Sequence, residues 1–265
     1  MGTPARLFYL GAAALAALTR YFRRMEGVWI PLGAPALVDW CESNYAVTPW
    51  VAEFWNTASS WLIVAMGVFG FWRCRDAELR FRLGMVGACA VGFGSSAFHG
   101  MLLRWAQAAD ELPMVWLGLA CAWTMADRAR APGEGTGLAW GLFGFGIAFC
   151  VAYWTVPAAF LLFVGVYGVI VAWLAIRTLH LSFFRSTSPR CRRMAVLVVA
   201  AYLGAFFAFW LPEHVLLPCD HPLQILQLHS WWHVGAGVGT VAWWEWARAD
   251  REGLAELRSD DVGAA

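Results

Sequence analysis

Three histidines lie in stretches of the sequence that are otherwise apolar. His99 follows Ser95 by four residues, which is one turn of a helix. His229 and His233 have the same spacing, so a helix would present both imidazoles on one face. Three histidine ligands with a fourth position open to water are typical of a catalytic zinc site. These residues therefore predict a metal centre that activates water.

An aspartate at the start of another apolar stretch could supply the acid and base for such a centre. Asp110 opens the sequence Asp110-Glu111-Leu112-Pro113 at the start of the predicted third span. His99 lies near the end of the predicted second span, on the same side of the membrane. We expect Asp110 to move a proton and Ser95 to hydrogen-bond the reacting oxygen.

Each of these residues also has a simpler interpretation. A single histidine in a span often pairs with a neighbouring helix, Asp110 could cap a helix, and Ser95 could bond to a carbonyl one turn earlier. Three histidines and one aspartate at the same depth, in spans nearly free of ionisable groups, favour the metal site.

A second group of polar residues precedes the first apolar stretch. It comprises the side chains of Asp39, Glu42, Asn44 and Glu53, and a turn could add the backbone carbonyl of Trp40. Hard oxygen ligands of this kind suit Ca²⁺ rather than Zn²⁺. The same residues also fit a polar, N-capped entry to the first span, and spacing alone leaves both interpretations open.

The elements that must hold these residues are membrane spans. Of the 265 residues, 60% are hydrophobic and 14% are charged, a composition typical of an integral membrane protein. Apolar runs of about 18 residues or more predict an all-α bundle of seven transmembrane helices. We place the spans near residues 55–72, 83–103, 111–127, 137–154, 156–176, 194–217 and 223–247.

The spans divide the chain into three regions. Residues 1–54 are predicted to form an interfacial segment and an ordered cap with the calcium ligands, residues 55–247 the bundle, and residues 248–265 a charged tail with a frayed helix end. Within the first region, residues 7–19 are too short to span a membrane comfortably. They are interpreted as an interfacial helix, with a signal-like stretch as the alternative.

The basic residues, all 19 of which are arginines, set the predicted orientation. They gather in the loops after the first, third and fifth spans and in the tail, whereas the other loops hold about one, Arg104. The positive-inside rule then places the C-terminus in the cytoplasm, and the N-terminus and the metal centre on the opposite side. Four arginines in the N-terminal segment argue against this orientation.

Composition also excludes two classes of function. The sequence has no lysine, which excludes a protein that holds retinal through a lysine Schiff base. A net charge of +1 provides no electrostatic basis for binding nucleic acid. The expected partner is a membrane lipid, and nothing in the sequence indicates an obligate protein partner.

Five motifs in order make the interpretation more specific. They are Asp39-Trp40-Cys41-Glu42-x-Asn44-Tyr45, Ala52-Glu53-Phe54-Trp55-Asn56-Thr57, Gly94-Ser95-x-x-Phe98-His99, Asp110-Glu111-Leu112-Pro113-Met114 and His229-x-Trp231-Trp232-His233. Through them, residues 38–245 strongly resemble the alkaline ceramidase family. That family is a member of a superfamily of seven-helix hydrolases that includes the adiponectin receptors.

The resemblance implies a zinc-dependent membrane amidase that hydrolyses ceramide to a sphingoid base and a fatty acid. It implies Zn²⁺ bound by His99, His229 and His233, with Ser95 and Asp110 assisting catalysis. It also implies Ca²⁺ bound by the side chains of Asp39, Glu42, Asn44 and Glu53 and the carbonyl of Trp40. The N-terminal extension is longer, and the loop before the last span shorter, than in the family pattern, so the substrate entrance is expected to differ.

The positions of the seven cysteines provide a test of the topology. Only Cys41 and Cys219 fall in segments predicted to lie outside the cytoplasm. Because only that side is oxidising, we predict a disulfide between them, which would tie the calcium segment to the loop before the last span.

Two other functions are alternatives to hydrolysis. A lipid receptor or metal sensor would hold zinc as a structural ion, but such a site needs no carboxylate and hydroxyl beside it, as Asp110 and Ser95 would provide. A metal transporter would need ligands along a path to both faces, and the inner halves of the predicted spans offer none.

Overall fold

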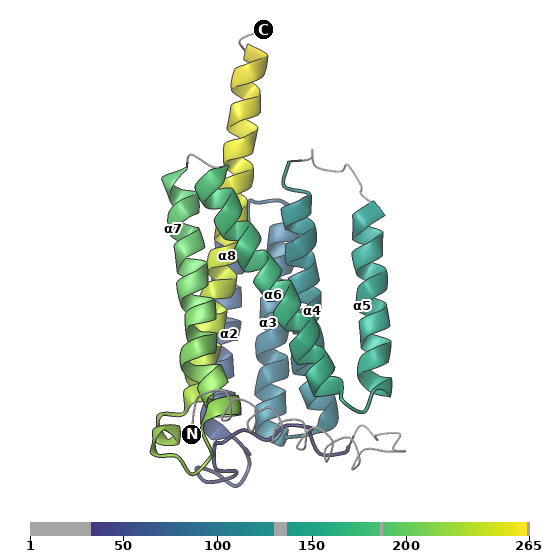
Figure 1. The fold of residues 1–265 in the computed structure, drawn as a ribbon, viewed down its shortest axis with the longest axis vertical. Coiled ribbons are helices and arrows are strands. Elements are labelled where there is room, and N and C mark those ends of the chain that lie inside the picture. Colours follow the sequence, from purple (N-terminus) through teal and green to yellow (C-terminus); the bar gives the residue numbers. More distant parts are fainter. Residues whose placement is uncertain (1–32, 130–136, 186–187, 264–265) are drawn as a thin grey trace, which may run out of the picture.

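The computed structural model describes residues 33–129, 137–185 and 188–263, which form an all-α membrane bundle (Figure 1). Seven long helical segments run along the bundle, and a short 3₁₀ helix, η4, precedes the last of them. The helices are α2 (Phe54–Arg73), α3 (Leu79–Met101), α4 (Arg104–Ala126), α5 (Gly137–Thr155), α6 (Ala159–Phe184), α7 (Pro189–Val198), its continuations η1 (Val199–Leu203), η2 (Phe206–Trp210) and η3 (Pro212–Leu216), η4 (Pro222–Leu226) and α8 (Leu228–Gly263). The predicted fold class is confirmed.

Each predicted span falls on one of these helical segments. Five segments are long and apolar enough to cross a membrane: α2, α3, α5, α6 and the segment from Pro189 to Leu216. The count of seven spans and the orientation of the termini therefore remain predictions. The predicted interfacial helix at residues 7–19 lies outside the described residues.

The predicted and observed helix starts differ by at most five residues, except at α4, where they differ by seven. Helix α4 begins at Arg104, before the predicted residue 111, because the guanidinium of Arg104 is buried and donates hydrogen bonds to Oη of Tyr153 at 2.6 Å and to its carbonyl at 3.1 Å. The last span begins at Leu228 rather than at residue 223, because the apolar residues before it form η4, which ends at Gln227 with φ 52°. Helix α8 then continues through Gly263, where we expected a frayed end.

The helical segment after Pro189 changes its hydrogen-bonding pattern partway along its length. It starts as an α-helix and becomes π-helical in η1, η2 and η3. Such π turns are rare and are frequently found at functional sites. In this chain they carry Tyr202, Phe206 and Trp210, whose side chains line an internal cavity.

Helices α3 and α4 approach each other closely at Gly94. A Cβ added to this glycine would lie 1.9 Å from the carbonyl oxygen of Ala109 and 2.8 Å from the backbone nitrogen of Asp110. Only a residue without a side chain allows this approach. The contact brings the part of α3 that carries Ser95 next to the part of α4 that carries Asp110.

The segment before α2 packs across the end of the bundle. The backbone N–H of Ala36 donates to the carbonyl of Leu102 at 2.8 Å, and that of Arg104 donates to Ala34 at 2.8 Å. The side chains of Val38 and Trp40 are buried against the bundle, in one cluster with Phe98. The predicted ordered cap is therefore present within residues 33–53.

Candidate metal centre

The three predicted zinc ligands meet in the structure. His99 lies in the last turn of α3, and His229 and His233 lie in the first two turns of α8. Their ring centroids are 4.6 to 5.0 Å apart, and one nitrogen of each lies within 4.8 Å of the others. All three side chains are buried. Within the described parts of the chain, no other group of three or more histidine, cysteine, aspartate or glutamate side chains is arranged to hold a metal.

The surroundings of these imidazoles fit a zinc ion. Nδ1 of His99 lies 2.5 Å from Oε2 of Glu53, whereas its buried Nε2 has no hydrogen-bond partner among the described groups. Nδ1 of His233 lies 2.8 Å from Oγ of Ser59. In zinc sites, a ligating imidazole generally has its second nitrogen held by a neighbouring polar group. Two of the three histidines are supported in this way, whereas Nδ1 of His229 is buried without a hydrogen-bond partner among the described groups. Three imidazoles form a donor set suited to Zn²⁺.

The two predicted catalytic residues line the same cavity as His229 and His233. Oγ of Ser95 is 3.4 Å from Nε2 of His233, and Ser95, Asp110, His229 and His233 line one cavity of about 550 Å³. Asp110 is in the second turn of α4, whose N-cap is Leu103, so the alternative interpretation of Asp110 as a helix cap is wrong.

Three residues of α2 lie next to the centre and were not predicted as site residues from the sequence. Asn56, Ser59 and Ser60 are buried, and Oγ of Ser60 lies 2.9 Å from Oγ of Ser95. Oδ1 of Asn56 accepts a hydrogen bond from Ser230 at 3.0 Å, which links α2 to the start of α8. A polar stripe spaced three or four residues apart in an apolar span was the signal that could have revealed these residues.

A buried hydrogen-bond network stands beside the cavity. Glu111 lines the cavity and accepts hydrogen bonds from Nε2 of Gln107 and from Oη of Tyr153, both at 2.7 Å. The guanidinium of Arg104 donates to the same Tyr153 hydroxyl. Oε1 of Gln107 also accepts the backbone N–H of Leu37 at 2.7 Å, so the network fixes the first turns of α4 to the cap and to α5.

The predicted calcium ligands lie together in the cap. Nδ2 of Asn44 donates to both carboxylate oxygens of Asp39 at 3.1 Å. The carboxylate of Glu42 accepts the backbone N–H groups of Trp55 at 2.7 Å and Asn56 at 2.9 Å, so it caps α2. The N-capped entry considered as the alternative is therefore present, and it is compatible with a cation because each carboxylate oxygen has a further lone pair.

Burial and neighbouring groups shift the carboxylates of this segment. Burial raises the pKa of Asp39, in opposition to the hydrogen bond from Asn44, which lowers it, and the negative charge of Glu53 adds to the rise. Burial also raises the pKa of Glu42, in opposition to the two helix N–H groups, which lower it. A divalent cation would relieve the repulsion among these carboxylates. Their carboxylate and carbonyl oxygens are the ligand type that Ca²⁺ prefers.

The cap touches the histidine centre at two points. The carboxylate of Glu53 joins them, because Oε1 accepts the backbone N–H of Trp40 at 2.9 Å while Oε2 faces His99. The indole of Trp40 stacks on the imidazole of His229, with ring centroids 3.7 Å apart. Glu53 thus has a second contact, with a predicted zinc ligand, that its assignment to calcium did not anticipate.

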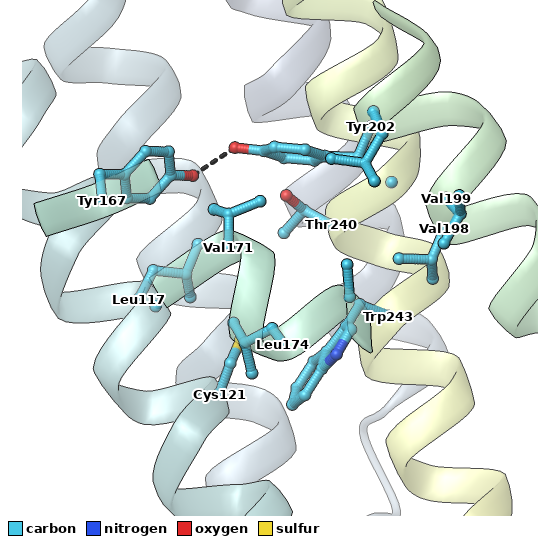
Figure 2. A pocket seen from close by; sticks show the side chains of 14 residues that line it. Leu117, Cys121, Tyr167, Val171, Leu174, Val198, Val199, Tyr202, Thr240 and Trp243 are labelled. Atoms are coloured by element: carbon cyan, nitrogen blue, oxygen red, sulfur yellow. Dashed lines mark hydrogen bonds between the residues drawn. The ribbon is translucent and has the colours of Figure 1, made fainter. Parts of the chain in front are cut away.

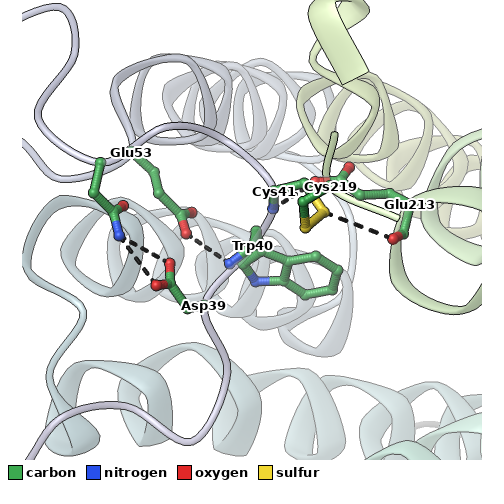
Figure 3. Close-up of a disulfide and its surroundings, with 7 residues drawn as sticks. Asp39, Trp40, Cys41, Glu53, Glu213 and Cys219 are labelled. Carbon is green, nitrogen blue, oxygen red and sulfur yellow. Dashed lines mark hydrogen bonds between the residues drawn. A yellow bond between two sulfur atoms is a disulfide. The ribbon is translucent and has the colours of Figure 1, made fainter. Parts of the chain in front are cut away.

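The predicted disulfide between Cys41 and Cys219 is confirmed (Figure 3). It joins the cap to the loop before α8, and the two Cα atoms are 4.9 Å apart. Beside it, Oε1 of Glu213 accepts the backbone N–H of Cys41 at 3.2 Å. The cap is therefore attached covalently and by hydrogen bonds to the segment that leads into His229 and His233.

Comparison with known proteins places the site in a family context. Residues 34–260 match the family model described as Ceramidase. The chain is 28% identical over 229 residues to alkaline ceramidase 3 of Mus musculus, an alignment that covers 81% of this chain and 83% of the mouse protein. It is 26% identical over 245 residues to alkaline ceramidase YPC1 of Saccharomyces cerevisiae (81% and 76% covered), and 28% identical over 222 residues to alkaline ceramidase of Arabidopsis thaliana (79% and 81% covered).

Proposed function

We propose, on the premise that the chain belongs to the ceramidase family, that it is a zinc-dependent membrane amidase that hydrolyses ceramide. The products are a sphingoid base and a free fatty acid. The observation that carries the proposal is the convergence of His99, His229 and His233 beside a cavity that Ser95 and Asp110 also line. A metal centre with a carboxylate and a hydroxyl beside it suits hydrolysis better than a structural role.

The side chains around the three histidines divide the chemistry among them. When bound, Zn²⁺ supplies Lewis acidity and a nucleophile derived from water at neutral pH. Asp110 takes the proton of the attacking water and delivers a proton to the leaving amine, because an amine leaves poorly until it is protonated. Ser95 donates a hydrogen bond to the oxygen that becomes negative, and Ser60, 2.9 Å behind it, orients its hydroxyl.

The shape of the cavity suits a lipid amide. The ionisable residues Asp110, Glu111, His229 and His233 of its wall come from the cap ends of α4 and α8, and apolar side chains such as Phe160, Phe163, Phe206 and Trp210 line much of the remaining wall. The amide lies at the polar end and the alkyl chains lie among the helices. The substrate enters from the lipid, and by the distribution of arginines the site and the N-terminus face away from the cytoplasm.

Calcium would support this chemistry from a distance. Asp39, Glu42, Asn44, Glu53 and the Trp40 carbonyl would hold Ca²⁺, and the bound ion would fix the cap against the start of α2. The cap in turn holds two of the three imidazoles, His99 through Glu53 and His229 through the Trp40 ring. Calcium therefore acts on the geometry of the zinc ligands without touching the substrate.

Two substitutions test the assignment together with the metal content. His233→Ala should lose both bound zinc and hydrolysis of a labelled ceramide in detergent, because two imidazoles do not hold the ion in a hydrolytic geometry. Asp110→Asn should keep the zinc and lose the hydrolysis. His180→Ala, on α6 with its ring packed against Phe184, is the control and should behave as the wild type. Turnover retained in either site variant would refute the proposal, and a wild type that binds zinc without hydrolysing ceramide would favour a receptor.

A further inference from the structure

A second, smaller cavity of about 70 Å³ lies next to the main one (Figure 2). Its walls come from four helices: Cys121 from α4, Leu174 from α6, Val198 from α7 and Trp243 from α8. None of these four residues lines the main cavity. In α8, Trp243 follows His233 by ten residues, so the small cavity lies deeper in the bundle than the metal centre.

The two cavities are separated by side chains that line both. Among them are Tyr167 of α6 and Tyr202 of η1, together with Leu117, Val171 and Thr240. The hydroxyl groups of Tyr167 and Tyr202 hydrogen-bond each other across the boundary (Figure 2). The pair thus joins α6 to η1, and each hydroxyl has a partner in apolar surroundings.

The two tyrosines differ in how closely they pack on a neighbouring helix. A Cβ on Gly239 of α8 would lie 2.8 Å from Cβ of Tyr202, so this side chain packs directly on the backbone of α8. A Cβ on Gly118 of α4 would make only an ordinary contact with Cε2 of Tyr167, at 3.9 Å. The boundary between the cavities is therefore tightly packed at Tyr202 and less tightly at Tyr167.

The small cavity is suited to hydrocarbon. The polar atom of its largest wall residue is already engaged, because Nε1 of Trp243 donates to Oγ1 of Thr178 at 3.0 Å. Leucine and valine side chains form other parts of the wall. Cavities of this kind stay dry and bind apolar groups. The volume corresponds to about two water molecules, at about 30 Å³ each, so only the end of an alkyl chain fits.

We propose that this cavity is a side pocket for the terminal methylenes of one alkyl chain of the lipid substrate, and that the Tyr167–Tyr202 pair controls entry of that chain into the pocket. The proposal rests on the function proposed above, and names a determinant of substrate selectivity within the same site. A chain that reaches past the pair gains buried apolar contact with side chains such as Leu174 and Trp243.

Substitutions that fill the pocket test this directly. Cys121→Leu and Val198→Leu each add apolar volume inside the pocket and leave the main cavity unchanged. Burial of one methylene contributes about 0.8 kcal/mol, or about fourfold, so kcat/KM for the preferred long chain should fall about fourfold for each methylene that the added side chain excludes. Turnover of the shortest chain should be unchanged.

Two changes at the boundary between the cavities should act in the opposite direction. Tyr167→Phe and Tyr202→Phe keep the rings but remove the hydrogen bond between them, so chains long enough to reach the pocket should gain in kcat/KM relative to the shortest chain. Val169→Leu is the matched control, because this α6 side chain is 71% exposed on the outside of the helix. Zinc content and thermal midpoint, measured for every variant, show that the metal centre and the fold are intact.

Two substrate series distinguish which chain uses the pocket. In one, the acyl chain varies at a fixed sphingoid base; in the other, the base varies at a fixed acyl chain. The preferred length should change in one series and not in the other. Unchanged preferred lengths in both series, for both filling variants at wild-type zinc content, would overturn the proposal.

A cross-linking measurement separates failure of the pocket from failure of the proposed function. A ceramide and a free fatty acid, each with a photoreactive group at the end of the alkyl chain, are irradiated with the Asp110→Asn protein. Mass spectrometry should find the label on peptides containing Cys121, Val198 or Trp243, and Cys121→Leu should abolish it. If the wild type lacks ceramidase activity but these peptides are labelled, the proposed function is wrong and the alkyl-chain pocket still stands. If the label is confined to peptides of the main cavity, the proposed alkyl-chain pocket is wrong.

Discussion

The two ends of the bundle use charged residues in opposite ways. At the arginine-rich end, acids and bases form ion pairs: Arg80 with Asp127 at 2.7 Å and Arg128 with Asp250 at 2.6 Å. Glu245 lies within 4 Å of three arginines, Arg73, Arg190 and Arg248. At the other end, the carboxylates of Asp39, Glu42 and Glu53 lie near one another and near histidines, and in the described residues their hydrogen bonds come from backbone N–H groups, asparagines and His99.

This difference suggests that the charges at the arginine-rich end serve stability, whereas those at the cap end serve the chemistry of the site. A carboxylate paired with arginine is compensated within the protein and needs nothing more. Carboxylates and imidazoles gathered without an arginine are compensated best by a metal ion from outside. The arginine-rich end is therefore complete as it stands, whereas the other end is arranged for ligands. The following changes test that division, beginning with the largest expected effect.

Gly94→Ala should have the largest effect on activity, because the added Cβ meets the backbone of α4 and the two helices must separate. A displacement of about 1 Å between Ser95 and Asp110 can lower the rate about 100-fold. Gly100→Ala is the control on the same helix, since its Cβ would find only ordinary contacts with Thr57 at 3.8 Å or more. Ceramide hydrolysis at equal protein and zinc content is the measurement, and equal rates for the two variants would contradict the predicted role of this helix contact.

Removing the disulfide should lower the stability of the cap and of the histidine centre without abolishing ceramide hydrolysis. The double variant Cys41→Ser, Cys219→Ser loses a link across 178 residues, which contributes about 2–4 kcal/mol to stability. A lower thermal midpoint in detergent is expected, together with faster loss of zinc, because the cap supports His99 and His229. Cys150→Ser, which removes a free cysteine of α5, is the control. A double variant that melts and retains zinc like the wild type would show that the cap is held by its other contacts.

Substitution of two acids of α8 should show that a buried ion pair at the arginine-rich end contributes more to stability than an exposed one. Asp250 is buried and accepts two hydrogen bonds from Arg128 at 2.6 Å, so Asp250→Asn should cost about 2 kcal/mol of stability. Glu252 is half exposed and pairs with Arg190 at 3.5 Å, so Glu252→Gln should cost less than about 0.5 kcal/mol. The turnover rate of the folded protein should stay the same in both. A fall in turnover without a fall in thermal midpoint would mean that this end also serves the chemistry.

An effect smaller than those of Gly94, the disulfide and Asp250 should come from Asp39, the exposed predicted calcium ligand. Asp39→Ala removes one oxygen ligand and a hydrogen-bond partner of Asn44, and should lower calcium affinity and stimulation of turnover by calcium about fivefold. Asp76→Ala, an exposed acid at the other end of the bundle, is the matched control. Isothermal titration with Ca²⁺, followed by turnover with and without a chelator, measures both quantities. Unchanged calcium binding in the Asp39 variant would remove Asp39 from the ligand set.

The sequence predicted those parts of the fold and site that depend on local patterns. Apolar length located the helices, and the four-residue spacings of Ser95 with His99 and of His229 with His233 correctly indicated shared faces. Start sites were less predictable. Arg104 reads as a loop residue, and it lies inside a helix only because Tyr153, 49 residues away, accepts its hydrogen bonds.

The features that the sequence did not predict are contacts between segments far apart in the chain. Nothing in the spacing of Glu53 indicates that it faces His99, 46 residues later, or that the ring of Trp40 stacks on His229. The capping of α2 by Glu42 uses a side chain that lies well before the helix, whereas sequence patterns consider the residue at its start. The disulfide was predictable because the predicted topology left only one pair of cysteines on the oxidising side.

The disulfide and the histidine centre also determine when the site can form during synthesis. Cys41 is made 178 residues before its partner, and His99 precedes His229 and His233 by most of the bundle. The cap and the first two helices therefore emerge with an unpaired thiol and one isolated imidazole. Since α8 supplies two of the three histidines, the metal centre comes into existence only when nearly the whole chain has been made. A truncated or stalled nascent chain therefore has membrane helices but lacks the three-histidine cluster.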